Sequence, residues 1–518
     1  MSTAAAFVPE ITSLTEVYPA QSQQRERLRW EHLLAKFEET YGHAAEFISR
    51  SPGRVNVIGE HIDYSLFSVL PMAVEADLLL AVRVLPEGSD ITISNVLSKF
   101  PQRTFSVPAQ GSGDLEIDST KLEWSNYFKS GYRGALEFLR RNGVKMAEKP
   151  PGLEILVDGN VPGGGGLSSS AGFVCASALA GMLSMGVQDV DKKELVSLAI
   201  VSERYVGVNA GGMDQSASVL GEDGKALFIS FDPELSADAV AFPKSEPEPV
   251  FLIANTYKTV EKHVTGPIHY NLRVVECTLA AELLAKKLAV GALPQDAGPL
   301  RTTLKGFMDT YLKQNPPAEG TTPIQHFEAM EKLAAETLTQ TEGYTREEMA
   351  GVLGISVEEL IKRYMTRFPI RAERFKLRDR ALHVFSEAAR VVKFYHILKE
   401  AEGQDPEEAL RKLGTMMDQS QESCKNLFDC SCEELDELCR LAKEMGSYGS
   451  RLTGAGWGGC CVHMVPADKA EAVKKAWLEK YYAGKGLSEE ELSEAIVVTK
   501  PGSGSVFFKV VEGVHDVL

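Results

Sequence analysis

The sequence predicts an α/β fold, because strand-like and helix-like patterns alternate along the chain around one glycine-rich loop. Residues 153–157 place apolar side chains at every second position, which predicts a strand. Residues 173–180 form a small-and-apolar run that is long enough for a buried helix. Between them stands Val-Pro-Gly-Gly-Gly-Gly-Leu-Ser-Ser-Ser-Ala, residues 161–171. The predicted order is therefore strand, glycine loop and helix.

The glycine loop is suited to binding a phosphate. Its four glycines allow the backbone to approach a ligand closely, and the N–H groups at a helix N-terminus attract anions. The serines stand where the helix begins, so they can cap its first N–H groups or contact phosphate oxygens or magnesium. The loop lacks the lysine of a Walker P-loop and the pattern of a dinucleotide fingerprint. The alternative interpretation is a flexible turn without a ligand.

Composition and charge restrict the class of protein. The chain has 518 residues, 44% of them hydrophobic and 25% charged, which is typical of a globular protein with two or three domains. The net charge of −17 argues against nucleic acid as the main partner, because a phosphate backbone requires a basic surface. A nucleotide needs only a local positive site, so it remains compatible with this charge.

The cysteines and the apolar runs predict a cytoplasmic protein without a membrane partner. Eight cysteines are too few for a disulfide scaffold, so reduced thiols are expected. Cys430, Cys432 and Cys439 lie close together in a stretch predicted to be helical, but they lack the spacing of a metal site. The first 20 residues show no basic segment of a signal peptide, and no apolar run approaches the length of a membrane span.

Periodicity along the chain predicts the remaining elements. Helices are predicted at 24–41, 124–140, 192–206, 270–290 and 468–482, with a series of helices at 382–444. Strands are predicted at 47–50, 69–84, 227–231, 250–254 and 505–511. Residues 233–249, rich in Pro, Glu, Ser and Ala, are predicted to link two halves. We therefore expect domains at 1–245 and 246–518, the second with an inserted region at about 293–351.

A second informative stretch is Ser-Pro-Gly-Arg-Val-Asn-Val-Ile-Gly-Glu-His-Ile-Asp-Tyr, residues 51–64. Glu60, His61 and Asp63 crowd into four positions, and three such groups could hold several hydroxyls of one small ligand. The alternative interpretation is a polar turn between strands. Arg54 by itself is also compatible with a surface ion pair.

Of two further glycine-rich stretches, one contains an aspartate and the other leads into an apolar segment. In residues 209–215, two glycines precede Asp214 at the start of a predicted short helix. Asp214 could be a helix N-cap, or it could orient or deprotonate a hydroxyl. Residues 451–462 form a second glycine-rich turn that runs into an apolar strand, and a tight hairpin is the plain interpretation.

Three of these motifs, at residues 53–63, 162–171 and 452–459, together resemble the GHMP kinase superfamily. The first motif, Gly-Arg-Val-Asn-x-x-Gly-Glu-His-x-Asp-Tyr, is similar to the signature of the galactokinase family within it. The resemblance covers nearly the whole chain. It implies two α/β halves with the active site in the cleft between them. It also implies an enzyme that transfers the γ-phosphoryl group of ATP to the anomeric hydroxyl of galactose.

The resemblance assigns roles to individual positions. It implies that Arg54 and Asp214 are catalytic. It also implies that Mg²⁺ contacts Ser170 and Glu203, of which Glu203 matches the family pattern less closely. The sugar-binding positions that it implies are Arg54, Glu60, His61, Asp63, Gly211, Asp214 and Tyr270. The nucleotide-binding positions that it implies are Trp124, Tyr127, Gly163, Gly164, Gly165, Gly166, Leu167, Ser168, Ser169 and Ser170. Core packing is the alternative role of Trp124 and Tyr127.

Two related functions remain as alternatives. N-acetylgalactosamine kinases share a very similar stretch, including the Ser-Val-Leu-Pro-Met-Ala of residues 68–73. Some fungal relatives bind sugar and ATP and then bind a transcriptional repressor, so a regulatory protein partner is the second alternative. The non-catalytic relatives lack the Ser-Ala pair after the phosphate loop, whereas Ser170 and Ala171 are present here, which favours catalysis.

Overall fold

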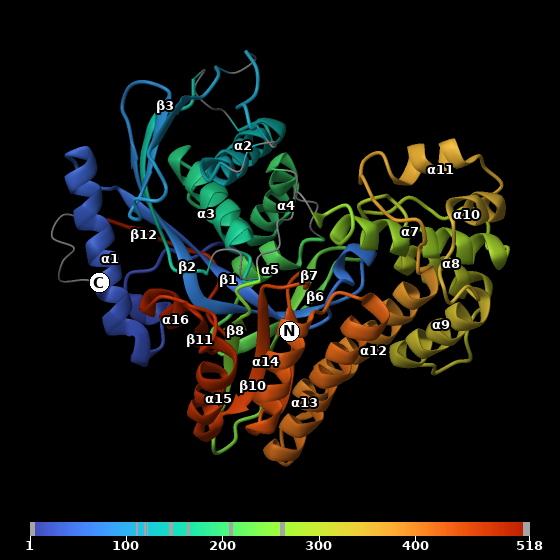
Figure 1. Cartoon of the computed structure of the whole chain (residues 1–518). Helices are drawn as coiled ribbons and strands as arrows, with labels where there is room; N and C mark the ends of the chain where they lie inside the picture. The colour runs from blue at the N-terminus through green and yellow to red at the C-terminus, as the bar shows by residue number, and fades with distance from the viewer. Residues whose placement is uncertain are drawn as a thin grey trace.

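Two large β-sheets, a two-stranded ribbon and the helices around them make up the described part of the chain, as Figure 1 shows. The computed structural model describes residues 6–109, 112–118, 121, 123–144, 149–162, 166–206, 211–258 and 265–510. The predicted mixture of strands and helices is confirmed. None of the helices in these described ranges combines the length and the apolar composition that a bilayer span requires.

The first sheet carries the N-terminal motif. Its strand order is β12-β1-β2-β5-β3-β4, and all neighbours are antiparallel except β3 and β5. The strands are β1 (Phe47–Ile58), β2 (Leu70–Val84), β3 (Asp90–Asn95), β4 (Arg103–Ser106), β5 (Leu153–Gly159) and β12 (Val506–Lys509). The last of these follows the second sheet in the chain and pairs with β1.

Helices cover both faces of this sheet. On one face Trp30, Leu33 and Phe37 of α1 (Ala20–Tyr41) pack against Leu79 and Ala81 of β2. On the other face α3 (Ser169–Ser184) packs against the alternate residues of β2, which include Leu78 and Leu80, and α2 (Ser125–Arg141) packs on α3. Because successive side chains of a strand point to opposite faces, β2 supplies both cores. Helix α4 (Lys192–Glu203) packs on α2 and α3, and α5 (Met213–Leu220) packs beside α3 against β1 and β2.

The second sheet has the order β11-β8-β10-β9 and is antiparallel throughout. Its strands are β8 (Pro249–Asn255), β9 (Gly449–Thr453), β10 (Cys460–Pro466) and β11 (Ile496–Thr499). Helices α13 (Pro406–Ser423) and α14 (Glu433–Glu444) pack against it, and α15 (Ala470–Trp477) packs on α14. A further short helix, α16 (Glu489–Glu494), precedes β11.

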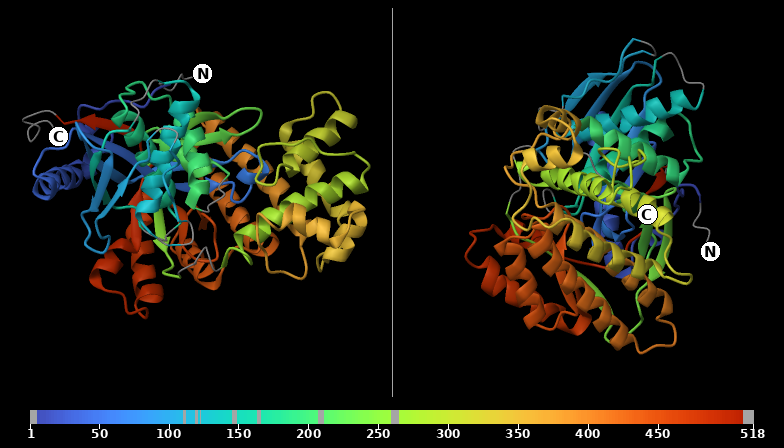
Figure 2. Two further views of the ribbon diagram at one scale, coloured as in Figure 1. Left: turned by 90° about the horizontal axis from the view of Figure 1, so that it is seen from above. Right: turned by 90° about the vertical axis from the view of Figure 1, so that its right-hand side faces the viewer.

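A group of helices lies between β8 and β9 in the chain, within the part that forms the second sheet. It consists of α7 (Tyr270–Lys287), α8 (Leu304–Gln314), α9 (Pro323–Thr337), α10 (Arg346–Leu353), α11 (Val357–Tyr364) and α12 (Leu377–Glu400). Figure 2 shows α8 to α11, in yellow and light orange, standing out at one end of the molecule. The predicted insertion at 293–351 corresponds to three of these helices. The predicted division of the chain into domains at 245/246 stays a prediction.

Two predicted segments differ from the structure. The strand predicted at 47–50 continues to Ile58, and all twelve residues of β1 are buried, so residues 51–58 are not a turn. The predicted linker at 233–249 contains β7 (Ser236–Ala241), which pairs with β6 (Lys225–Ser230). β7 has mostly half-exposed or exposed side chains, so its sequence lacks the apolar alternation that signals a buried strand.

The cysteine-rich stretch is also only partly helical. A single π turn, η4 (Cys424–Phe428), ends at Asp429, whose φ of 55° breaks the helix. Cys430 and Cys432 therefore lie in the connection to α14, and only Cys439 is helical. All eight cysteines are free thiols.

Candidate active site

The strand β1, the start of α3 and the start of α5 meet at one place. Arg54 N–H donates to Leu167 O at 3.0 Å, so the segment before α3 pairs with β1. A Cβ on Gly53 would meet Leu167 O at 2.8 Å, which explains why a glycine stands there. The first two motifs are therefore joined through backbone contacts rather than through long side chains alone, and side-chain hydrogen bonds join Asp214 to both.

Asp214 is held by a charged and a neutral donor. Arg54 Nε donates to Asp214 Oδ1 at 2.6 Å, and Ser168 Oγ donates to Asp214 Oδ2 at 2.5 Å. Arg54 also donates from Nη1 to Gly166 O at 2.6 Å. Burial disfavours the Arg54 cation, but Asp214 and Glu60 outweigh it and raise the pKa of Arg54. The arginine therefore stays charged beside the carboxylate.

The possible N-cap roles at these two helices are wrong. Gly212, with a φ of 111°, is the N-cap of α5. Asp214 is the second residue of this helix, and its carboxylate accepts a hydrogen bond from Arg54 instead of capping the helix. Ser168, with a φ of 56°, is the N-cap residue of α3, but its hydroxyl makes no capping hydrogen bond because it is bonded to Asp214. The first turn of α3 thus has no side-chain cap, and Ser169 and Ser170 there are half-buried.

The phosphate loop contacts the third motif. A Cβ on Gly166 would meet Thr453 O at 2.8 Å, and one on Gly454 would meet Gly166 O at 3.0 Å. The turn between β9 and β10 has positive φ at five positions, namely Gly454, Gly456, Trp457, Gly458 and Gly459. The hairpin interpretation of this motif is confirmed, and the hairpin also packs against the loop before α3. Gly163, Gly164 and Gly165 lie outside the described residues.

Glu60 and His61 connect the turn after β1 to the same hairpin. Glu60 Oε2 accepts from Arg451 Nη2 at 3.1 Å and from Gly454 N–H at 3.2 Å. Burial raises the pKa of Glu60 to about 7, although Arg451 opposes the rise. His61 Nε2 lies 2.8 Å from Ala455 O, so this nitrogen carries the proton and donates it. Burial lowers the pKa of His61 to about 3, which keeps the ring neutral.

Asp63, Gly211 and Tyr270 lie next to these residues. A Cβ on Gly211 would meet Asp63 Oδ2 at 2.3 Å and Tyr64 N at 2.7 Å, so the two segments touch. Burial and the charge of Asp214 raise the pKa of Asp63 to about 6. The Tyr270 ring lies 5.8 Å from the His61 ring, and burial together with Asp63 raises the pKa of the Tyr270 phenol. These residues therefore share one electrostatic environment with Asp214 and Glu60.

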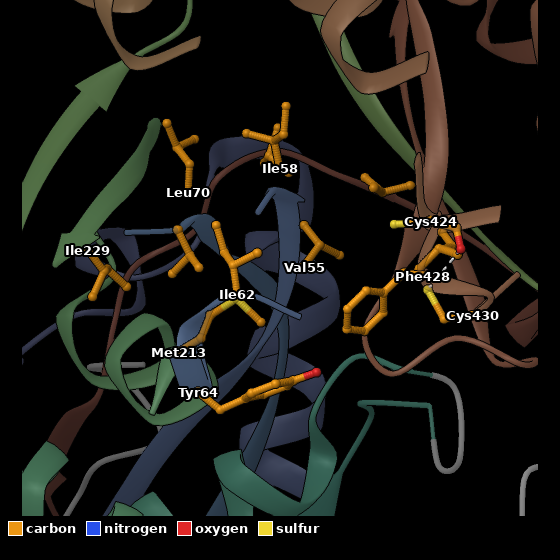
Figure 3. Packing of buried hydrophobic residues seen from close by; sticks show 14 of the residues in the cluster. Val55, Ile58, Ile62, Tyr64, Leu70, Met213, Ile229, Cys424, Phe428 and Cys430 are labelled. Carbon is orange, nitrogen blue, oxygen red and sulfur yellow. Dashed lines mark hydrogen bonds between the residues drawn. The ribbon is translucent and has the colours of Figure 1, made fainter. Parts of the chain in front are cut away.

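An apolar layer supports the polar residues. Figure 3 shows Val55 on β1, Ile62 and Tyr64 near it, and Phe428 facing this group from the segment that carries Cys424 and Cys430. The Phe428 ring lies 4.8 Å from the His61 ring. Close packing of this kind restricts the rotamers of the side chains above it.

The remaining predicted residues lie around the start of α3. Glu203, at the end of α4, is buried and accepts a hydrogen bond from Gln215 Nε2 of α5. Tyr127 is half-buried, and burial and the charge of Glu203 raise its pKa. The Trp124 ring is parallel to that of Phe173 in α3, with 6.3 Å between centroids. Its indole N–H donates to Pro101 O at 3.1 Å.

Comparisons with known proteins agree over almost the whole chain. The galactokinase of Saccharomyces cerevisiae is 40% identical to it over 97% of this chain and 98% of that protein. The galactokinase of Schizosaccharomyces pombe is 39% identical, over 94% of this chain and 96% of its own length. The chain belongs to the galactokinase family.

Family models locate the match within the galactokinase-family chain. The galactokinase galactose-binding signature covers residues 35–84, the N-terminal GHMP kinase domain 126–222 and the C-terminal GHMP kinase domain 406–483. The crystal structure of Lactococcus lactis galactokinase complexed with galactose has the same fold, with a TM-score of 0.65 and 24% identity over 92% of this chain and 99% of that one. As a member of this family, the protein is an ATP-dependent sugar kinase.

Two residues of the site had no predicted role. Arg451 directly precedes the third motif, but nothing in the sequence ties it to Glu60, which is 391 positions away. Glu387 lies in α12 and accepts from Gly59 N–H at 2.9 Å. A charged residue within a helical pattern is ordinarily solvent-exposed, so only its complete burial distinguishes Glu387.

Proposed function

We propose that the enzyme transfers the γ-phosphoryl group of ATP to the C1 hydroxyl of galactose, giving galactose 1-phosphate and ADP. The observation that carries this proposal is the position of Asp214 between Arg54 and Ser168. Ser168 directly precedes α3, where the phosphates would bind, and Arg54 extends from the strand that leads to Glu60 and Asp63. One carboxylate thereby joins the phosphate side and the sugar side of the site.

In this proposal Asp214 orients the C1 hydroxyl and accepts its proton. The sugar oxygen forms a bond to the γ-phosphorus, the bond from that phosphorus to the β,γ-bridging oxygen breaks, and the hydroxyl proton passes to Asp214. A loose transition state favours late proton transfer, and Arg54 stabilises the carboxylate and the charge on the transferring group.

The phosphates are proposed to bind at the N-terminus of α3. Uncapped amides in its first turn, together with those of the glycine loop, provide N–H donors for an anion. Ser169 and Ser170 add hydroxyls there, and the parallel rings of Trp124 and Phe173, with Tyr127 nearby, offer an aromatic surface for the adenine.

Ser170 and Glu203 are proposed as the residues that would hold a magnesium ion. Hydroxyl and carboxylate oxygens are the hard ligands that Mg²⁺ prefers. Gln215 Oε1 is buried beside Glu203 and has no hydrogen-bond partner among the described residues, so the oxygen donors here fit a hard cation. When bound, Mg²⁺ neutralises charge on the β- and γ-phosphates. No group of three or more His, Cys, Asp or Glu side chains in the described part of the chain forms a separate metal site.

The sugar is proposed to bind beside Glu60, Asp63, Gly211 and Tyr270. Glu60 uses Oε2 for Arg451 and Gly454, whereas Oε1 accepts no hydrogen bond from the residues that the structure describes. Both ring nitrogens of His61 already contact the protein, at Ala455 O and at Tyr64 Oη. We therefore propose Glu60 and Asp63 as the main hydroxyl acceptors and His61 as a neutral wall of the pocket.

An assay of purified enzyme with ATP, Mg²⁺ and several hexoses tests the function. We expect ADP release with galactose, and much less with N-acetylgalactosamine or glucose. Phosphorus NMR should identify the product as the 1-phosphate. EDTA should abolish the activity, and excess Mg²⁺ should restore it. Preference for N-acetylgalactosamine would replace the proposed substrate, and failure to phosphorylate any hexose would refute the proposal.

A cytoplasmic location is proposed as well, since all eight cysteines are free thiols. Binding to a repressor stays a prediction.

Substitution of Arg54 by lysine should lower kcat by about 10- to 100-fold, because a charge-assisted hydrogen bond contributes about 1.5–3 kcal/mol. Lysine keeps the positive charge but cannot bond Asp214 and Gly166 O together with one planar group. Steady-state kinetics with galactose and ATP measure the effect, and the melting temperature checks the fold. An Arg54→Lys enzyme with unchanged kcat would remove the guanidinium from the proposed mechanism.

A further inference from the structure

A buried polar network lies behind the turn that carries Glu60. It is formed by residues of α12, α13 and β9, more than 300 positions later in the chain. His383, Glu387 and Val391 follow one another at intervals of four residues, so they lie on one face of α12. All three are fully buried. This face packs against the turn, since a Cβ on Gly59 would meet Val391 Cγ2 at 3.0 Å.

Glu387 binds the backbone of the turn. Its Oε1 accepts from Gly59 N–H at 2.9 Å, from Glu60 N–H at 3.4 Å and from Ser420 Oγ at 2.6 Å, while Oε2 accepts from Arg390 Nε at 2.7 Å. Burial opposes its ionisation, but Arg390 and the other donors lower the pKa of Glu387 to about 2. The carboxylate is therefore charged and fully engaged.

Arg451 binds the side chain of the same turn. It donates from Nη2 to Glu60 Oε2 at 3.1 Å, from Nη1 to Asn56 O at 2.8 Å and from Nε to Ser420 Oγ at 3.1 Å. Ser420 thus connects Arg451 to Glu387 through one hydroxyl. His383 completes the network, with Nε2 donating to Glu60 O at 3.0 Å.

We propose that Glu387 and Arg451 are positioning residues for sugar binding, which hold the backbone and the carboxylate of Glu60 in the orientation that receives the substrate. This inference rests on the proposed function. Neither residue touches the proposed reacting atoms, so each acts through Glu60. The network fixes Glu60 at its carbonyl, its amide and one carboxylate oxygen, and leaves the other carboxylate oxygen for a hydroxyl.

The alternative is a purely structural network, and the two roles differ in what they change. A network that only stabilises the fold affects the melting temperature and both substrates alike. A network that orients Glu60 affects galactose selectively, because ATP is proposed to bind at α3 on the other side of Asp214. A misplacement of catalytic or binding groups by about 1 Å can cost on the order of 100-fold, so small shifts of Glu60 are measurable.

The first test is Arg451→Lys, with Glu387→Gln as the second variant in case the first does not fold. Each substitution should raise KM for galactose about 10-fold. Lysine lacks the planar guanidinium group of arginine, and glutamine presents a neutral amide to Arg390 in place of the carboxylate. KM for ATP should change by less than about twofold. Arg50→Lys is the matched control, because Arg50 is equally buried and bonds Asp77 and Gly504 O away from the sugar turn. It should lower the melting temperature and leave both KM values unchanged.

A double-mutant cycle separates positioning from general stability. In a Glu60→Gln background, Arg451→Lys should have almost no further effect on KM for galactose, because the two residues act through one carboxylate. Multiplicative effects of the two substitutions, or equal rises in KM for galactose and ATP, would overturn the inference. If the unmodified enzyme phosphorylates no galactose, the proposed function fails instead, so the two failures are distinguishable.

Discussion

Replacement of Asp214 by asparagine is expected to lower kcat by about 10²- to 10⁴-fold, which is the usual contribution of a positioned general base. Asparagine has nearly the same shape and can still accept from Arg54 at Oδ1 or from Ser168, but it cannot take the proton of the sugar hydroxyl. The KM values should change much less than kcat, because the side chain retains its place at the start of α5. Steady-state kinetics with galactose and Mg²⁺-ATP measure the effect.

The matched control for Asp214→Asn is Asp191→Asn. Asp191 is the N-cap of α4 and accepts from Glu194 N–H at 3.0 Å, and asparagine caps helices as well as aspartate does. This variant should keep the kcat of the unmodified enzyme. If Asp214→Asn also turned over at a nearly normal rate, Asp214 would have no part in proton transfer, and the mechanism would rest on orientation alone.

Replacement of Gly211 by alanine is expected to raise KM for galactose about 100-fold. The added Cβ would lie 2.3 Å from Asp63 Oδ2, 2.5 Å from its Cγ and 2.7 Å from Tyr64 N. Asp63 must therefore move by roughly 1 Å or more, and a displacement of that size costs on the order of 100-fold in a positioned site. Steady-state kinetics with each substrate varied in turn measure this effect, and KM for ATP should remain nearly unchanged.

Gly351→Ala provides the matched control for the glycine substitution. Gly351 lies in α10, its added Cβ would meet no atom within 4 Å, and its φ is not positive, so alanine should be neutral or slightly stabilising there. If Gly211→Ala left KM for galactose unchanged, Asp63 would not be a sugar ligand. In the Asp63→Ala enzyme the alanine at position 211 should have a smaller effect, because the clash with the carboxylate is absent and only the contact with Tyr64 N remains.

Local patterns were sufficient for most of the fold. Apolar patterns predicted α1, α2 and β2 to within a few residues, because each helix packs one regular face against a core and β2 is an apolar run buried on both faces. It failed for β7, a ribbon strand whose side chains are mostly exposed and therefore need no alternation. It also missed the full length of β1, because Ser51, Pro52 and Gly53 are usual in turns but are buried here.

The candidate site was predictable only where several of its polar residues stand close together in the sequence. Arg54, Glu60, His61 and Asp63 stand within ten positions of one another, so their motif is visible without a structure. Glu387 has no such signal, because its partners Gly59 and Ser420 belong to distant segments. The role of Ser168 could not be predicted from the local sequence either. A serine at the start of a helix ordinarily accepts a hydrogen bond from the helix backbone, whereas Ser168 donates one to a carboxylate.

The pairing of β12 with β1 bears on when the enzyme becomes active during its synthesis. Arg50 of β1 donates to Ser503 O across 453 positions of sequence, and Phe47 to Arg50 pair with residues 506–509. The strand that carries Arg54 thus remains an open edge while the ribosome translates the second sheet. We expect nascent chains to lack turnover until residues 503–509 have emerged, so that prematurely terminated products neither phosphorylate sugar nor hydrolyse ATP.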